Sequence, residues 1–271
     1  MSATCRRCAV LGRPIAHSLS PVMHRASYAA LGLDWSYDAV DVTEDGLAGF
    51  LDGLDGSWRG LSVTAPLKRR LVGLLDQVSG DVESLGVANT VLFEPDGRRI
   101  GFNTDVPGGL NALREAGVDA PDSARILGGG ATAASMALTL ARLGVTRLEV
   151  VVRDVTRADE VLAVAAAQGV EAAAVTLDGS DRAPVDVLVS TIPASAADPS
   201  WAASAGAVFD VLYDPWPTPL AQAAQAAGIP VVNGLDLLAH QAALQVHLMT
   251  GGTVPASLLR AAALAELAAR G

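Results

Sequence analysis

Lysine is nearly absent from this chain of 271 residues, because 18 of its 19 basic residues are arginine and one, Lys68, is lysine. Surface positive charge is therefore normally supplied by arginine here, and a position that keeps lysine needs its own explanation. The formal net charge is −10. That balance argues against nucleic acid or an anionic membrane as the main partner, because both require a basic face.

Cysteine is also scarce, since the chain has only Cys5 and Cys8, which form one C-x-x-C pair. A single pair cannot supply the four ligands of a structural zinc site, so we expect reduced thiols and no metal. The sequence has no apolar run of the length that a membrane span or a signal peptide needs. We therefore expect a cytoplasmic protein.

Hydrophobic residues make up 51% of the chain and charged residues 18%, which is typical of a globular protein of one or two domains. Apolar strand patterns alternate with helical patterns along most of the sequence. This alternation predicts an α/β fold in which helices cover both faces of a largely parallel sheet. The predicted strands are 8–12, 35–42, 58–64, 124–127, 147–154, 185–193, 207–213 and 228–234, with a hairpin of 87–94 and 98–103. The predicted helices are 21–32, 44–54, 66–76, 106–117, 131–144, 159–169, 234–251 and 255–270.

A glycine turn joins the predicted strand at 124–127 to the following helix, with the sequence "GGGATA" from Gly128 to Ala133. Gly128, Gly130 and Ala133 match G-x-G-x-x-A in the strand–turn–helix context that a dinucleotide site requires. Glycines let a pyrophosphate approach the backbone amides at a helix N-terminus. The alternative is a tight turn without a ligand. We interpret the segment as a dinucleotide site that includes Gly129, Ala131 and Thr132.

The end of the next strand indicates which dinucleotide is bound. Arg153 and Arg157 lie there, and arginine favours the 2′-phosphate of NADP, whereas an acidic residue favours the free hydroxyl of NAD. Asp154 lies between them and leaves NAD possible. The alternative is a surface Arg–Asp pair. We favour NADP.

Two serines, Ser18 and Ser20, precede a predicted helix that has Pro21 in its first turn. Ser20 is placed to cap that helix, and capping alone is one interpretation of the pair. The other is that two hydroxyls and the helix N-terminus hold a carboxylate of a substrate.

Lys68 follows Thr64 by four residues, so in a helix the two side chains face one site. A lysine in a first helical turn is commonly a solvated charge, but Arg69 and Arg70 show that arginine serves that purpose here. Lysine can lose its proton at accessible pH and arginine cannot. We therefore interpret Lys68 as a proton donor and acceptor.

Asparagine, threonine and aspartate cluster at the ends of the predicted hairpin, as Asn89, Asn103, Thr104 and Asp105. Asp105 alone could cap the helix that follows it. Amide and carboxylate oxygens also bind hydroxyl groups, and a carboxylate beside a lysine holds it in place. Together with Lys68, these residues predict a site for a polyol.

Eight stretches, in order along the chain, resemble the shikimate dehydrogenase family. They are "LGRPIAHSLSPVMH" (11–24), "SVTAPLK" (62–68), "GVANT" (86–90), "GFNTD" (101–105), the glycine turn (128–133), "VRDVTRA" (152–158), "LYDPWPTPL" (212–220) and "NGLDLLAHQAALQ" (233–245). The resemblance implies an enzyme that reversibly reduces 3-dehydroshikimate to shikimate in aromatic amino acid biosynthesis, usually with NADPH.

The resemblance also implies a role for each matching residue. Lys68 and Asp105 would be the catalytic pair. The substrate-binding residues would be Ser18, Ser20, Thr64, Asn89, Tyr213 and Gln241. The cofactor would contact residues 128–133, Arg153 and Arg157, and we add Thr191 and Gly234 to that set.

The implied organisation is an N-terminal α/β substrate domain (1–105), a Rossmann-type NADP domain (106–235) and C-terminal helices (236–271) that pack back on the substrate domain. The implied partner is the small substrate alone, in a monomer or a homodimer.

Three positions depart from the family pattern: Val152-Arg153-Asp154 replaces Asn-Arg-Thr, Ala131 replaces a frequent glycine, and Leu237 or Leu238 replaces a methionine. Two alternative functions stay open. One is an NAD-dependent dehydrogenase of quinate, shikimate or an aminated analogue. The other is a non-catalytic sensor of cofactor or ligand, which would have no need of both Lys68 and Asp105.

Overall fold

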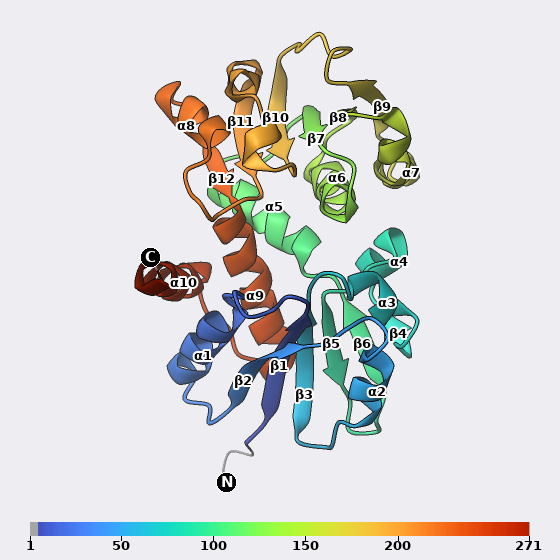
Figure 1. Ribbon diagram of the computed structural model, residues 1–271, viewed down its shortest axis with the longest axis vertical. Helices are drawn as coiled ribbons and strands as arrows, with labels where there is room; N and C mark the ends of the chain where they lie inside the picture. Colours follow the sequence, from blue (N-terminus) through green and yellow to red (C-terminus); the bar gives the residue numbers. More distant parts are fainter. Residues whose placement is uncertain (1–4, 271) are drawn as a thin grey trace. The chain divides into compact units, whose positions relative to one another are not determined.

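The computed structural model describes residues 5–270, and the chain divides into two compact units (Figure 1). We call Met1–Asp105 with Ala239–Gly271 the N-terminal unit, and Val106–Leu238 the central unit. The chain passes between them in two helices, α5 (Asp105–Glu115) and α9 (Gly234–Thr250).

The N-terminal unit contains a mixed sheet with the strand order β2-β1-β3-β5-β6-β4. Its strands are β1 (Arg7–Gly12), β2 (Ser36–Asp41), β3 (Trp58–Val63), β4 (Gln77–Val78), β5 (Thr90–Phe93) and β6 (Arg99–Phe102). β1 runs parallel to β2 and β3, whereas β5 runs antiparallel to both β3 and β6. The predicted hairpin is therefore confirmed, and it makes this sheet mixed rather than parallel.

Helices cover both faces of this sheet, and the alternation of side chains along β1 shows how. Cys8 and Val10 join a cluster with Tyr28 of α1 (Ser20–Ala30) and Met249 of α9. The intervening Ala9 and Leu11 join a second cluster on the opposite face, as expected for side chains that alternate with period 2. The helices that contribute to the second cluster are α2 (Leu47–Asp52), α3 (Lys68–Val72) and α4 (Gly80–Leu85). The last helix, α10 (Ala256–Arg270), packs on α1.

The central unit contains a fully parallel sheet with the order β12-β11-β10-β7-β8-β9. Its strands are β7 (Ser123–Leu127), β8 (Arg147–Val152), β9 (Glu171–Thr176), β10 (Val185–Ser190), β11 (Ala205–Asp210) and β12 (Val231–Asn233). Counted from β7, this is the strand order 3-2-1-4-5-6 of dinucleotide-binding folds. The predicted Rossmann-type fold is confirmed.

The helices of the central unit follow its strands in the predicted alternation. Besides α5 they are α6 (Ala131–Leu143), α7 (Asp159–Ala167), α8 (Pro219–Ala226) and the 3-10 helices η1 (Val155–Ala158), η2 (Ala194–Ala196) and η3 (Pro199–Ser204). The sequence does not predict four of these strands and α-helices, which are β4, α4, β9 and α8.

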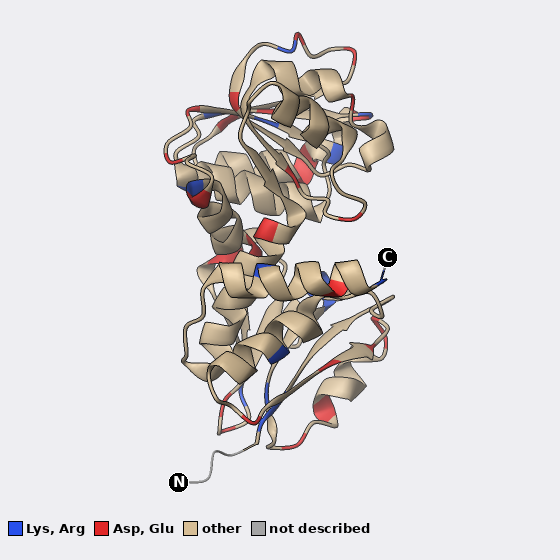
Figure 2. Cartoon of the chain, turned by 90° about the vertical axis from the view of Figure 1, so that its left-hand side faces the viewer, with Lys and Arg blue, Asp and Glu red and all other residues tan. Residues whose placement is uncertain are grey.

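Acidic and basic residues lie on both units, and most of the ribbon in Figure 2 carries neither, in agreement with the charged fraction of 18%. Within residues 5–270, no helix is long and apolar enough to cross a membrane, and no three His, Cys, Asp or Glu side chains are grouped as metal ligands. Cys5 and Cys8 are not joined in a disulfide. Burial raises the pKa of the Cys8 thiol to about 11, so it stays protonated at neutral pH.

The imidazole of His24 in α1 lies in the core of the N-terminal unit and is fully buried. It stacks on Tyr37, with ring centroids 3.9 Å apart, and contacts Tyr28 and Gln245. Burial lowers the pKa of His24 to about 3 from the ordinary 6.5. The folded protein therefore holds a neutral imidazole across the physiological range.

This burial predicts how stability depends on pH. Between about pH 6.5 and pH 3 the unfolded chain binds a proton at His24 that the folded chain does not. The free energy of unfolding should therefore fall as the pH falls, by about 1.4 kcal/mol per pH unit from this residue. Urea unfolding at pH 4 to 8 should show this contribution below about pH 6.5 in the wild type, and His24→Phe, which keeps a ring against Tyr37, should lack it. Equal slopes in the two proteins would contradict the assignment.

Candidate active site

The chemically distinctive residues of the N-terminal unit lie at one edge of its sheet. β1 and β3 are parallel neighbours, so the loops after Gly12 and Val63 leave the sheet at the same edge. β5 starts at that edge, because Thr90 pairs with Ser62 near the end of β3 and with Phe102 at the end of β6. The topology therefore brings the segments 13–20, 64–68, 86–89 and 103–105 to one place.

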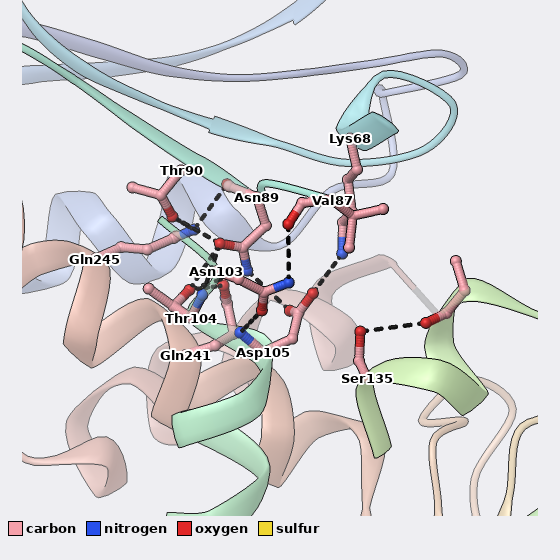
Figure 3. A network of polar contacts seen from close by, with 11 residues as sticks. Lys68, Val87, Asn89, Thr90, Asn103, Thr104, Asp105, Ser135, Gln241 and Gln245 are labelled. Atoms are coloured by element: carbon pink, nitrogen blue, oxygen red, sulfur yellow. Dashed lines mark hydrogen bonds and ion pairs between the residues drawn. The ribbon is translucent and has the colours of Figure 1, made fainter. Parts of the chain in front are cut away.

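The centre of the site is an ion pair between Lys68 and Asp105 (Figure 3). Lys68 is the first residue of α3, Asp105 is the first residue of α5, and Nζ lies 2.6 Å from Oδ2. The side chains are 30% and 18% exposed, so the pair is sheltered yet accessible. A charged hydrogen bond of this length fixes the direction of the ammonium group.

Asn89 holds the other oxygen of the same carboxylate. Its Nδ2 donates to Asp105 Oδ1 at 2.9 Å, and its Oδ1 accepts the backbone N–H of Thr104, also at 2.9 Å. The side chain is buried, with 2% exposure. Because an N–H group can only donate, Thr104 fixes which end of the Asn89 amide faces Asp105.

Asn103 and Gln241 complete the surroundings of Asp105. The side-chain oxygen of Asn103 accepts the backbone N–H of Asp105 at 3.0 Å, and its nitrogen donates to the carbonyl of Val87. The Thr104 hydroxyl lies 3.3 Å from Oε1 of Gln241, on α9. Asp105 therefore does not cap a helix that begins after it. It is itself the first helical residue, and its own amide is bound by Asn103.

Ser18 and Thr64 lie on the loops at this edge and Ser20 begins α1, but two expectations about these residues are wrong. Ser20 makes no side-chain cap. It is the first residue of α1, and its backbone N–H donates to Ser18 Oγ at 3.3 Å. Thr64 and Lys68 are not one helical turn apart, because α3 begins only at Lys68 and a turn closed by the bond from Leu67 N to Thr64 O precedes it.

The glycine turn of the central unit opens α6, as predicted. At Gly128, where φ is +116°, a Cβ atom would collide with the hydroxyl of Thr191, and at Gly129 with the backbone carbonyl of Arg157. At Gly130 it would meet nothing within 4 Å. Gly130 is also the N-cap of α6 and offers no side chain to its amides. The first two glycines therefore let the chain pack on itself, and the third leaves open space at a helix N-terminus, which fits a pyrophosphate.

Arg153 and Arg157 flank the next turn, after β8, and both are exposed. Asp154, between them, is the N-cap of η1, where its Oδ1 accepts hydrogen bonds from the backbone N–H and the hydroxyl of Thr156. These bonds lower the pKa of Asp154. The Asp154 carboxylate thus has a local structural role as a helix cap. This role explains the aspartate without a ribose hydroxyl of NAD as its ligand.

Two other residues assigned from the sequence also lie in the central unit. Tyr213 is in the loop that follows β11, and Gly234 begins α9. A side chain at Gly234 would collide with the carbonyl of Val211, so this glycine lets α9 start close against the loop that carries Tyr213. Hydrogen bonds join Lys68, Asp105, Asn89 and Thr104 to one another, with Gln241 beside Thr104.

A set of buried polar residues behind Asn89 is not predicted from the sequence. Gln245 donates to the Thr90 hydroxyl, which donates to Asn89 Oδ1, and Ser62 donates to Gln245. One signal in the sequence points to Gln245. It follows Gln241 by four residues, so the two lie on the same face of α9.

The comparisons with known proteins extend over both units of the chain. The family model described as "Shikimate dehydrogenase substrate binding domain" matches residues 10–91. The shikimate dehydrogenase (NADP(+)) of Thermus thermophilus is 39% identical over 252 residues, which cover 90% of this chain and 92% of that protein.

Two solved structures extend the comparison. The shikimate 5-dehydrogenase of Mycobacterium fortuitum is 41% identical with a TM-score of 0.90 and covers 97% of this chain and 99% of its own. The quinate dehydrogenase of Corynebacterium glutamicum, solved in complex with NAD, is 30% identical with a TM-score of 0.88, over 96% and 99% of the two chains. The sequence motifs, the fold and these relatives agree that this chain belongs to the shikimate dehydrogenase family.

Proposed function

We propose that this chain is an NADP-dependent shikimate dehydrogenase, which reversibly reduces the 3-keto group of 3-dehydroshikimate to the hydroxyl of shikimate. The observation that carries the proposal is the Lys68–Asp105 pair, with Nζ and Oδ2 2.6 Å apart and Asn89 on the second oxygen. The relatives named as NADP-dependent shikimate dehydrogenases support the same reaction.

Lys68 handles the proton of the reacting oxygen. The cofactor, when bound, supplies or accepts the hydride. As the keto group is reduced, negative charge develops on its oxygen, and Lys68 Nζ donates a proton to it. In the oxidation direction Lys68 takes the proton of the alcohol. Asp105 accepts the hydrogen bond of the ammonium group and so keeps Nζ directed at one place.

The other polar residues orient the substrate. Amide and carboxylate groups of Asn89, Asp105 and Gln241 would contact the ring hydroxyls, together with the hydroxyl of Thr64. Ser18 and Ser20, with the N-terminus of α1, would hold the ring carboxylate, and Tyr213 would add a phenol hydroxyl. Holding the ring at both ends would place the reacting carbon in one orientation, and positioning of this kind lowers the barrier to reaction.

NADP would lie along the glycine turn of the central unit. The open space at Gly130 and the uncapped N-terminus of α6 suit its pyrophosphate. Residues 128–133, Thr191 and Gly234 would line this position. Arg153 and Arg157 would bind the 2′-phosphate, because a guanidinium group matches the geometry of a phosphate.

The arginine assignment predicts a change of cofactor preference. In Arg153→Ala/Arg157→Ala, the KM for NADP should rise about 10- to 100-fold, because hydrogen bonds to a charged group contribute about 1.5–3 kcal/mol. The KM for NAD should change little. Arg147→Ala is the matched control, because Arg147 is an exposed arginine of the same unit whose guanidinium pairs with Asp122. Equal losses of affinity for the two cofactors in the double variant would refute the assignment.

The alternative with a specific observation behind it is an NAD-dependent quinate dehydrogenase, because a structure of that name is 30% identical over nearly the whole chain. The capping role of Asp154 weighs against NAD here. A non-catalytic sensor is a further alternative, and the retained Lys68–Asp105 pair opposes it. The cytoplasmic location and the oligomeric state stay predictions.

Initial rates of the purified protein on shikimate and on quinate, each with NADP and with NAD, test the proposal. We expect the highest kcat/KM for shikimate with NADP. A higher value for quinate with NAD would replace the proposal by the first alternative, and no turnover with any pair would favour the sensor.

A further inference from the structure

Behind the Lys68–Asp105 pair, buried side chains form a continuous chain of hydrogen bonds that we call the relay, from Tyr37 through Ser62, Gln245, Thr90 and Asn89 to Asp105. Figure 3 shows its part from Gln245 to Asp105. Between Tyr37 and Asn89 each side chain is at least 96% buried. A buried polar group without a partner costs about 1–3 kcal/mol, so each hydrogen in this chain has a preferred direction.

The direction of every bond follows from groups that can only donate or only accept. The nitrogen of the Gln245 amide lies 3.3 Å from the backbone carbonyl of Asn89, which only accepts. Gln245 Nε2 must therefore face Asn89 and Thr90, and Oε1 must face Ser62 and His24. The amide of Gln245 has one orientation that satisfies all its neighbours.

Thr90 passes that orientation on to Asn89. Its hydroxyl accepts from Gln245 Nε2 at 2.9 Å, so its own hydrogen is directed to Asn89 Oδ1, 2.8 Å away. The Thr90 hydroxyl and the Thr104 backbone N–H then both donate to Oδ1, and the Thr104 hydroxyl lies 3.1 Å from the same oxygen. The opposite end of the amide, Nδ2, consequently points at Asp105.

The far end of the relay is held by groups that stay neutral. Burial lowers the pKa of His24 to about 3, so its Nε2–H donates to Gln245 Oε1 and its Nδ1 faces the Tyr28 hydroxyl. Burial also raises the pKa of Tyr37, whose hydroxyl donates to Ser62 at 2.6 Å. The relay therefore fixes a direction without placing a net charge in the core.

We propose that Gln245 and Thr90 are positioning residues for the catalytic pair, which hold the Asn89 amide so that Asp105 stays directed at Lys68. The proposal rests on the role proposed for Lys68 and Asp105. It adds a support on α9 to the bond from the Thr104 backbone, because Gln245 is anchored on that helix, between Ser62 of β3 and Thr90 of β5.

The single lysine of the chain makes a direct test possible. Labelling the full-length protein with ¹³C-lysine gives one lysine side-chain signal by NMR, and that signal reports the surroundings of the Lys68 ammonium group. Thr90→Val removes the hydroxyl but keeps the shape of the side chain, and Thr90→Ser keeps the hydroxyl. Asp105→Asn marks where the signal lies when the ion pair is lost.

We expect the Lys68 signal of Thr90→Val to move from the wild-type position toward that of Asp105→Asn, and that of Thr90→Ser to stay near the wild type. Gln245→Met should behave like Thr90→Val. The control is Ser27→Ala, which removes a fully buried hydroxyl of the same unit that donates to Met23 and lies outside the relay. Its signal should not move.

The kcat for shikimate should change in parallel with the position of the Lys68 signal. It should be about 10-fold lower in Thr90→Val and close to the wild-type value in Thr90→Ser, because small misplacements of catalytic groups have effects of this size or larger. A wild-type signal in both Thr90→Val and Gln245→Met would overturn the proposal. So would an equal shift in Ser27→Ala. Failure of the proposed function would instead appear as a wild-type protein without turnover, while the lysine signal would still test the relay.

Discussion

Lys68→Arg is expected to lower the kcat for shikimate oxidation about 10³-fold, within the range that proton transfer by a positioned side chain contributes. Arginine keeps the positive charge and can still pair with Asp105, but its guanidinium group does not give up a proton in proteins. The change therefore separates a proton-transfer role from a purely electrostatic one. Steady-state rates at saturating shikimate and NADP measure the effect.

Three controls define this experiment. The thermal midpoint of Lys68→Arg should lie close to that of the wild type, because the residue is partly exposed at the start of a short helix. Arg69→Lys, which changes the neighbouring exposed cation, should leave kcat unaltered. The dissociation constant for shikimate should change little. A kcat within a few-fold of the wild type would show that proton transfer is not what requires a lysine at this position.

Asp105→Asn is expected to lower kcat about 10²-fold, with the fold retained, which is the lower end of the range for acid–base groups. The two carboxylate oxygens of Asp105 accept hydrogen bonds from Lys68 Nζ and Asn89 Nδ2. An asparagine has one oxygen and one NH₂ group, so it can accept from only one of the two and must turn a donor toward the other. In one orientation the NH₂ group of the new asparagine faces Lys68 Nζ, and in the other it faces Asn89 Nδ2. Two donors then face each other, so the geometry of the site is lost.

Asp38→Asn is the matched control for this change. Asp38 lies in the same unit and also pairs with a cation, Arg25, but on the exposed surface of the protein. Surface pairs of this kind contribute about 0–1 kcal/mol, so the variant should keep both its stability and its rate. If Asp105→Asn were as active as Asp38→Asn, the carboxylate would have no part in catalysis.

The fold is predictable wherever a long pattern of apolar residues is present. The parallel strands β7, β8, β10 and β11 and the helices α6 and α9 agree with the sequence patterns within a few residues. Short or weakly patterned elements are missed. β4 has two residues, β9 is rich in alanine, and the first-turn proline of α8 follows an irregular loop that obscures its start.

The centre of the site is predictable for a different reason. Lys68 differs in type from every other cation of the chain, and Asn89 and Asp105 stand in short motifs at strand ends. The relay is not predictable in this way. Ser62 and Thr90 are ordinary residues of strands, and Ser62 contacts Gln245 across 183 positions of sequence. Their roles depend on tertiary contacts that no local pattern records.

The most direct measurement of the central claim, that Lys68 acts by transferring a proton, is the rate of shikimate oxidation by Lys68→Ala with small amines added. Proton transfer by Lys68 predicts a very low rate without amine and a rate that rises in proportion to added ethylamine, which can replace the missing group as a base. Guanidinium at the same ionic strength should restore nothing. Near wild-type turnover without amine, or equal restoration by guanidinium, would contradict this role for the lysine.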